Sequence, residues 1–287
     1  MTSRFQHFVL NALMLFGTVV SGAQQATVPY GEMKHPSQQL GREMTFRYVL
    51  PDGYEEKIKT GARFPVVYLL HGLSGNFKNW SDKTDIAERA RKHGFITVFP
   101  DGGDGWYTDS ETVKSDRYEG YLVLDLIPFI DSTFKTVATK EGRGVAGLSM
   151  GGYGAIKYGL KYPGSFSIVG SFSGALDAPL RSQDNPALSP SLNQTFGAMD
   201  SETRWRNDVF RIAELSSPEE IASVPFIFFA CGVDDWLFDI NRNFAALLVK
   251  KKMPHEFRQI PGRHEWRLWA EQAAEFLTLA DRRFRGQ

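Results

Sequence analysis

The stretch Gly147-Leu148-Ser149-Met150-Gly151-Gly152 decides the fold of this chain. A short β-rich run at residues 144–146 precedes it and an apolar run at residues 153–162 follows it, so the context is strand, sharp turn and helix. The pattern G-x-S-x-G in that context predicts a serine at the tip of a strained turn, with its hydroxyl clear of the sheet. Side chains at Gly147 or Gly151 would collide with the neighbouring strand or helix, which explains the two glycines. The backbone N–H of Met150 is expected to point into a site at the N-terminus of that helix.

Strands and helices alternate along most of the chain. Strand patterns cover residues 44–50, 64–70, 95–99, 166–172, about 224–230, and 256–260. Helical patterns cover residues 82–93 and 118–134, the second with an expected kink at Pro128. Several strands are continuously apolar, as in strands that are buried on both faces of a parallel sheet. The rhythm predicts an α/β fold with a mostly parallel central sheet and helices on both faces.

Two segments break this rhythm. Residues 26–40 are mostly polar and contain prolines, so an extended lead-in to the first strand is expected. Residues 175–217 are rich in Ser, Asn, Asp and Pro, and no strand pattern interrupts them. Because loops longer than about 15 residues are usually functional or mobile, this excursion is expected to lie above the carboxyl edge of the sheet and to shape a substrate pocket.

The N-terminus has the pattern of an export signal. Arg4 supplies a positive charge, residues 8–20 form an apolar stretch that is short for a membrane span, and Ser21-Gly22-Ala23 offers small residues for a signal peptidase. We therefore expect a signal peptide at residues 1–23 and a catalytic domain at residues 24–287, secreted or periplasmic. No other stretch is long and apolar enough to cross a bilayer, so no stable membrane insertion is expected after cleavage.

Composition and motifs exclude several classes of function. The 33 basic and 33 acidic residues give a formal net charge of zero, which argues against nucleic acid as a partner. No zinc, calcium or nucleotide-binding pattern is present, so the sequence predicts no metal and no cofactor. The single cysteine, Cys231, follows an apolar run and is expected to be a buried, inert thiol. The sequence predicts no oligomeric state.

The remaining chemistry centres on Ser149. A serine hydroxyl needs a general base and an orienting carboxylate, and in this kind of sheet they follow in the order Ser, acid, His. His264 alone among the six histidines follows Ser149 in a loop at the carboxyl end of a strand. The acid is expected after the preceding strand, where Asp234 and Asp235 compete. Asp235 is favoured because a turn at Gly232 would bring the third residue after it back over the site, leaving Asp234 to pair with a surface cation.

The oxyanion hole needs a second backbone N–H from the loop after an early strand. His71-Gly72-Leu73-Ser74-Gly75 follows the strand pattern at residues 64–70, so the N–H of Leu73 is expected to act with that of Met150. His71 is interpreted as a structural residue that braces this loop. Around the site we expect Trp106, Tyr107 and Trp236 to bind substrate, because flat aromatic surfaces suit a sugar ring or a phenolic acyl group.

These motifs together resemble the esterase D-like branch of the α/β hydrolases, which includes tributyrin-type and feruloyl-type carboxylesterases, S-formylglutathione hydrolases and the antigen 85 mycolyltransferases. The matching stretches span nearly all of the mature chain: residues 70–76 with Trp80, residues 100–103 with Trp106 and Tyr107, residues 147–152, residues 171–174, Cys231-Gly232 with Asp235, and Gly262 with His264, Trp266 and Trp269. The resemblance implies an α/β-hydrolase fold, a triad of Ser149, Asp235 and His264, and oxyanion donors at Leu73 and Met150.

The prediction for function is therefore a secreted serine carboxylesterase that hydrolyses short-chain acyl esters, such as acetyl or feruloyl esters of carbohydrates. One alternative is an acyltransferase of the antigen 85 type, which shares the acyl-enzyme step. Another is an S-formylglutathione hydrolase, which the leader argues against because those enzymes are cytosolic. A non-catalytic binding module is the third, and an intact triad argues against it.

Overall fold

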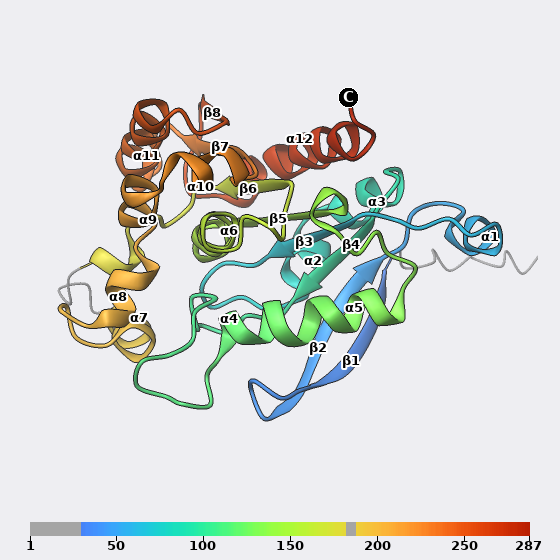
Figure 1. The fold of residues 1–287 in the computed structure, drawn as a ribbon, viewed down its shortest axis with the longest axis horizontal. Coiled ribbons are helices and arrows are strands. Elements are labelled where there is room, and N and C mark those ends of the chain that lie inside the picture. Colours follow the sequence, from blue (N-terminus) through green and yellow to red (C-terminus); the bar gives the residue numbers. More distant parts are fainter. Residues whose placement is uncertain (1–29, 182–187) are drawn as a thin grey trace, which may run out of the picture.

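The computed structural model describes residues 30–181 and 188–287, so the predicted signal peptide lies outside the described residues. A single eight-stranded sheet forms its centre, in the order β1-β2-β4-β3-β5-β6-β7-β8 (Figure 1). The strands are β1 (Gly31–Ser37), β2 (Arg42–Val49), β3 (Val66–Leu70), β4 (Ile96–Pro100), β5 (Arg143–Leu148), β6 (Ile168–Phe172), β7 (Phe226–Gly232) and β8 (His255–Ile260). The first two strands are antiparallel to their neighbours and the other six are mutually parallel. The predicted α/β-hydrolase fold with a mostly parallel sheet is confirmed.

Helices cover both faces of this sheet, because its central strands bury side chains on both sides. Along β3, Tyr68 belongs to one hydrophobic core and Val67 to the other. The first core packs under α6 (Met150–Lys161), α11 (Phe238–Lys251), η1 (Tyr121–Leu126), α5 (Ile127–Thr133) and α9 (Val209–Leu215). The second packs under α3 (Ile86–Arg91) and α12 (Trp266–Phe284). The shorter elements are α1 (Tyr54–Lys59), α2 (Asn79–Lys83), α4 (Tyr118–Gly120), η2 (Lys140–Gly142), η3 (Ala178–Leu180), α7 (Ser189–Phe196), α8 (Glu202–Asn207) and α10 (Pro218–Ser223).

The parallel register brings the ends of four strands to one edge. Leu70 of β3 lies beside Gly147 of β5, and Gly232 of β7 lies beside Ile260 of β8. The loops that follow these strands therefore meet above the carboxyl edge of the sheet, where sites in such folds are built.

The structure corrects two local predictions. The lead-in forms an edge strand, β1, in which Pro36 pairs with Glu43; an edge strand tolerates the missing N–H of proline. The helix expected at residues 82–93 is two helices, α2 and α3, separated by extended backbone at Thr84. The kink expected at Pro128 stays a prediction; the π-helical segment η1 directly precedes α5, and Pro128 lies in the first turn of α5.

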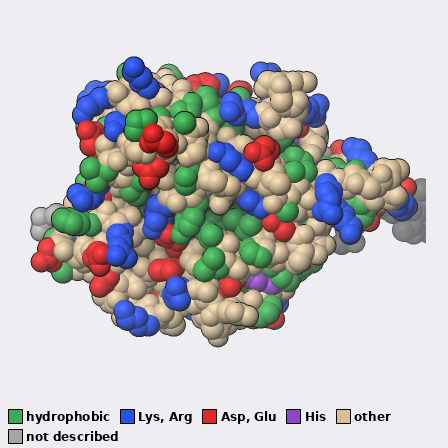
Figure 2. Space-filling view, viewed as in Figure 1, with side chains coloured by type: hydrophobic (Ala, Val, Ile, Leu, Met, Phe, Trp, Pro, Cys, Tyr) green, Lys and Arg blue, Asp and Glu red, His purple; other side chains and the backbone are tan. Residues whose placement is uncertain are grey.

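The surface mixes charges of both signs. Figure 2 shows Lys and Arg side chains interspersed with Asp and Glu over the face in view, around a central group of hydrophobic side chains. Within residues 30–181 and 188–287, no helix has the length and apolar character that a membrane span requires.

Candidate active site

Ser149 lies at a strained turn between β5 and α6. Its backbone has φ 51° and ψ −114°, a conformation that side chains other than glycine rarely adopt. A Cβ atom at Gly147 would lie 2.5 Å from the carbonyl group of Gly151, and one at Gly151 would lie 2.6 Å from the carbonyl oxygens of Leu70 and His71. The two glycines therefore let the first turn of α6 approach the ends of β3 and β5, as the sequence predicted.

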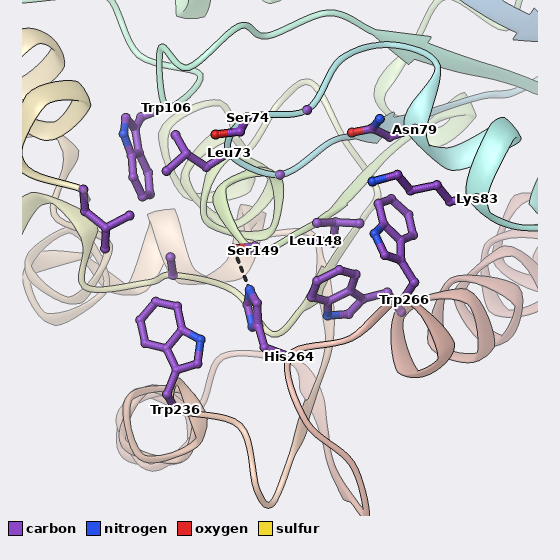
Figure 3. Close-up of a pocket in the computed structure, with 15 residues that line it drawn as sticks. Leu73, Ser74, Asn79, Lys83, Trp106, Leu148, Ser149, Trp236, His264 and Trp266 are labelled. Carbon is purple, nitrogen blue, oxygen red and sulfur yellow. Dashed lines mark hydrogen bonds between the residues drawn. The ribbon is translucent and has the colours of Figure 1, made fainter. Parts of the chain in front are cut away.

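The structure brings Ser149, His264 and Asp235 into one line of hydrogen bonds, of which Figure 3 shows the one between His264 and Ser149. The Nε2 atom of His264 lies 3.1 Å from the Oγ atom of Ser149, and its Nδ1 atom lies 2.9 Å from the Oδ2 atom of Asp235. His264 stands in the loop between β8 and α12, and Asp235 follows β7. With a proton on Nδ1, the histidine presents an unprotonated Nε2 to the serine hydroxyl.

Asp235 is buried and well supplied with donors. Its Oδ1 accepts the backbone N–H of Leu237 at 2.9 Å, and its carboxylate also accepts a hydrogen bond from the hydroxyl of Ser173. Burial alone would raise the pKa of Asp235, but the hydrogen bonds from His264, Leu237 and Ser173 outweigh it and hold the pKa below its usual value. Asp235 is therefore ionised at neutral pH and can orient the imidazole.

Asp234 and Cys231, which lie close to Asp235 in the sequence, differ in their exposure to solvent. Asp234 is exposed, and among the described residues no cation lies within 4.0 Å of its carboxylate, so its predicted pairing with a surface cation was wrong. Cys231 is fully buried, as predicted, and burial together with the charge of Asp235 raises the pKa of its thiol to about 12. The thiol therefore stays protonated and unreactive at neutral pH.

Two residues near Ser149, Met150 and Leu73, have backbone N–H groups that donate to no acceptor among the described residues. Met150 is the first residue of α6, where helical geometry leaves its N–H without an acceptor. Leu73 follows β3 in the loop that begins at His71. The ring of His71 braces this loop: its Nδ1 donates to the carbonyl oxygen of Gly72 at 2.8 Å, and its Nε2 accepts the N–H of Gly102 at 2.8 Å. Both ring nitrogens are engaged, so His71 is not available as a second base.

A cavity of about 290 Å³ opens beside Ser149. Trp106 and Trp236 line it, as expected for two of the three predicted substrate-binding residues. Tyr107 does not line it: its side chain is fully buried beneath the site, and its hydroxyl donates to the carbonyl oxygen of His71 at 3.1 Å. The prediction that Tyr107 contacts substrate is therefore corrected.

Sequence reasoning missed several residues that line the cavity. Figure 3 shows Trp236 on one side of His264 and Trp266 on the other, with Lys83 reaching in beside Trp266. Trp269 packs edge-on against His264 with ring centroids 4.8 Å apart. The sequence signal that could have found them is the pair of tryptophans two and five residues after His264. Residues three apart in a helix lie on the same face, so both rings can face the cavity. The other lining residues are Gly72, Leu73, Ser74, Gly75, Asn79, Leu148, Ala175 and Leu188.

Metal ligation has no basis in this part of the chain. Within the described ranges, 30–181 and 188–287, no group of three or more His, Cys, Asp and Glu side chains has the arrangement needed to hold a metal ion. The side chains that meet at Ser149 are a hydroxyl, an imidazole and a buried carboxylate in hydrogen-bond contact, an arrangement that can activate a serine hydroxyl.

The family described as "Putative esterase" matches residues 37–278. The chain belongs to this esterase family. It is 28% identical to an acetyl esterase of Caldicellulosiruptor saccharolyticus over 81% of this chain and 91% of the relative. It is 25% identical to an S-formylglutathione hydrolase of Paracoccus denitrificans over 81% and 85% of the two chains. The solved structure of FphF, a fluorophosphonate-binding serine hydrolase of Staphylococcus aureus, superposes with a TM-score of 0.77 at 22% identity and covers 88% of this chain and 98% of its own. This esterase is thus a carboxylic ester hydrolase, in agreement with the predicted resemblance.

Proposed function

We propose that this esterase hydrolyses short-chain acyl esters through a covalent acyl-enzyme on Ser149. The observation that carries the proposal is the unbroken line of hydrogen bonds from Asp235 through His264 to Ser149, at the mouth of an aromatic-walled cavity. A serine hydroxyl is a weak nucleophile at neutral pH, and this arrangement is the one that activates it.

The reaction runs in two halves. In the first, the Oγ atom of Ser149 attacks the ester carbonyl while Nε2 of His264 takes its proton; the oxyanion accepts hydrogen bonds from the N–H groups of Leu73 and Met150. His264 then returns the proton to the leaving alkoxide as the ester C–O bond breaks, and the acyl-enzyme remains. In the second half, His264 takes a proton from water, hydroxide adds to the acyl carbon, and the proton returns to Ser149 as the acid leaves.

The test is the Ser149→Ala variant with p-nitrophenyl acetate. Loss of the nucleophile is expected to lower turnover by about 10⁴-fold or more. A fluorophosphonate probe is expected to label Ser149 in the folded wild-type protein. A variant that keeps nearly the wild-type rate, or a folded wild-type protein that the probe does not label, would refute the mechanism and favour a binding module.

The cavity supports a small acyl group and an alcohol that stacks on aromatic rings. Its volume of about 290 Å³ and its tryptophan walls suit an acetyl or a feruloyl ester of a carbohydrate. The measurement is a chain-length series of p-nitrophenyl esters beside methyl ferulate and acetylated xylo-oligosaccharide. A kcat/KM that climbs beyond about eight acyl carbons, without activity on the phenolic or carbohydrate esters, contradicts this substrate class.

Hydrolysis of S-formylglutathione is the second candidate, and Lys83 favours it. Lys83 lines the cavity with its Nζ 5.0 Å from the centroid of the Trp266 ring, and no carboxylate of the described chain lies within 4.0 Å of it. The glutathione portion of that thioester carries carboxylates, whereas a neutral sugar ester does not use this charge.

Lys83→Met separates the two candidates, with Lys78→Met as the matched control. Lys78 is also exposed and also lies over an aromatic ring, that of Phe77, but it does not line the cavity. If glutathione thioesters are the substrate, only Lys83→Met raises KM for S-formylglutathione, while both variants keep the wild-type kcat/KM for p-nitrophenyl acetate. Equal effects of the two substitutions would remove the support for this candidate.

We also propose that residues 1–23 are a cleaved signal peptide, that residues 24–287 form the catalytic domain, and that the enzyme is secreted or periplasmic. The support is the pattern of charge, apolar stretch and small residues in the sequence. Intact-mass measurement of the protein from its native host tests this. Residues 1–23 retained in a cytosolic enzyme would contradict export and strengthen the S-formylglutathione candidate.

A further inference from the structure

The turn at Trp106 and Tyr107 holds an unusual backbone conformation. Both residues have positive φ, 51° and 50°, although neither is glycine, and both side chains are buried. Such a conformation persists only where the surrounding structure determines it, and it is found most often near functional sites. The contacts that hold this turn therefore indicate what it is for.

A buried ion pair holds the turn from below. The Nζ atom of Lys157, on α6, donates to the carbonyl oxygen of Tyr107 at 2.6 Å and to the Oγ1 atom of Thr108 at 2.8 Å. The same ammonium group pairs with the Oε2 atom of Glu119 at 2.6 Å, and both side chains are buried. The hydroxyl of Tyr158 donates to the Tyr107 carbonyl as well, at 2.9 Å. Two donors from the helix that follows Ser149 thus fix the position of one carbonyl group.

The side chain of Tyr107 reaches from this turn to the loop after β3. Its ring packs so closely that a Cβ atom at Gly102 would lie 2.4 Å from it, and one at Gly154 would lie 2.8 Å from it. Its hydroxyl donates to the carbonyl oxygen of His71 at 3.1 Å. The ring cannot shift without moving the chain around it, so this hydrogen bond fixes the peptide group between His71 and Gly72.

The next peptide group carries the N–H of Leu73. Its carbonyl oxygen, on Gly72, accepts Nδ1 of His71 at 2.8 Å and the N–H of Gly75 at 3.1 Å. A trans peptide is planar and its N–H points away from its C=O. The two hydrogen bonds to the Gly72 carbonyl therefore set the direction of the Leu73 N–H. The position of that peptide group depends on the preceding one, whose carbonyl oxygen, on His71, accepts the Tyr107 hydroxyl.

We propose that Tyr107 is a positioning residue for the oxyanion hole, held in place by the buried pair of Lys157 and Glu119. It fixes the backbone from His71 to Leu73 through its hydrogen bond to the His71 carbonyl. The inference rests on the proposed function, in which the Leu73 N–H stabilises the oxyanion. It assigns to Tyr107 a role under the site in place of contact with substrate.

Tyr107→Phe removes only the hydroxyl, and Tyr54→Phe is the matched control. Tyr54 is also buried in the same core, and its hydroxyl also bonds the backbone, accepting the N–H of Lys135 at 3.0 Å. It packs against Phe64, before the start of β3 and away from the His71 loop at the end of that strand. Both variants lose one buried hydroxyl hydrogen bond, so they are expected to lower Tm to a similar extent. They differ only in which backbone segment is released.

The measured quantities are kcat/KM for p-nitrophenyl acetate and the Ki of a trifluoromethyl ketone, which forms a reversible hemiketal with Ser149 and places its oxyanion in the hole. Removal of an oxyanion donor lowers kcat by about 10²- to 10³-fold, so a donor that is only misplaced is expected to lower the rate by about 10-fold. Tyr107→Phe should lower kcat/KM by about 10-fold and raise Ki by the same factor, since both report transition-state binding. Tyr54→Phe should change each by less than about 2-fold.

A second variant tests the same contact in case Tyr107→Phe does not fold. Tyr158→Phe removes one of the two donors to the Tyr107 carbonyl and is expected to shift kcat/KM and Ki in the same directions by about 3-fold. If Tyr107→Phe and Tyr158→Phe both fold and leave Ki within about 2-fold of wild type, the inference is wrong while the proposed function stands. If the wild-type protein is not labelled by the fluorophosphonate probe, the proposed function fails instead.

Discussion

Glu119→Gln tests how much the buried ion pair contributes to stability. The Glu119 carboxylate forms ion pairs with Lys157 and Lys161, each at 2.6 Å, and accepts a hydrogen bond from the hydroxyl of Tyr162 at 2.7 Å. Burial alone would raise the pKa of Glu119, but the charges of the two lysines bring it down to about 2. Burial lowers the pKa of Lys157 to about 8, against the attraction of Glu119. The glutamine variant would leave the Lys157 ammonium buried without its counter-charge.

The expected loss of stability is large. Removing one partner of a buried pair costs about 3–5 kcal/mol, and for a chain of this size that corresponds to a fall of about 6–20 °C in Tm. The matched control is Glu56→Gln, which breaks the exposed pair of Glu56 with Lys59 at 2.8 Å and is expected to change Tm by about 1 °C or less. Differential scanning calorimetry of the three proteins at pH 6 measures both effects.

The pH dependence gives a sharper test of the same reasoning. Without Glu119, the pKa of folded Lys157 falls further below about 8, while the unfolded chain keeps that proton to about pH 10.5. The variant therefore gains stability as the pH rises towards 8, before the wild type does, and its deficit shrinks. Below about pH 4.5 the wild type loses the contribution of Glu119 as the pH falls towards 2, and the deficit shrinks again. A deficit under about 1 kcal/mol at pH 6, or one that stays constant from pH 3 to 8, refutes the argument.

Three further predictions follow from single contacts. Gly147→Ala is expected to cost about 1–3 kcal/mol and to lower esterase activity, because its Cβ would meet the Gly151 carbonyl group, whereas Gly164→Ala, with no atom within 4 Å, is expected to be neutral in urea unfolding. His35 is buried between the rings of Tyr121 and Phe129, and burial lowers its pKa; wild type should lose stability as the pH falls below about 6.5, and His35→Phe should flatten that slope in thermal melts. Arg204→Met is expected to change the ranking of ester substrates while Ser149 still reacts with a small fluorophosphonate, and an unchanged ranking would contradict a pocket-shaping role for the excursion.

The residues at strand ends were predictable from the sequence because the parallel sheet brings them together. Ser149 and Asp235 each follow an apolar strand pattern, and His264 follows the more polar strand pattern at residues 256–260. The carboxyl ends of parallel strands share one edge. Their spacing along the chain is therefore irrelevant once the strands are recognised. The edge strand β1 was not predicted, because its polar residues and Pro36 have no strand pattern and it forms only by pairing with β2.

The excursion shows why the rest of the pocket could not be predicted. Its described part is held by Arg204, which is buried and donates to the carbonyl oxygens of Pro179, Arg181, Gly197 and Ala198 and to the side chain of Asn193. Among the described residues no carboxylate pairs with it, and all of its acceptors except the Asn193 side chain are carbonyl oxygens of the folded backbone. An arginine in a polar segment is typical of an exposed residue, and nothing in its sequence neighbourhood indicates burial.

Tyr107 illustrates the same limit at the candidate site. An aromatic pair after a glycine-rich loop is equally compatible with lining a pocket and with packing beneath it, because sequence gives the composition of a turn but not the direction of each side chain. Here consecutive positive φ angles at Trp106 and Tyr107 send one ring into the cavity and the other under the His71 loop. The direction depends on Lys157, which lies 50 residues away and donates to the turn. The side chains that pack beneath the cavity are thus oriented by long-range contacts, whereas Ser149, Asp235 and His264 follow from the ends of the strands.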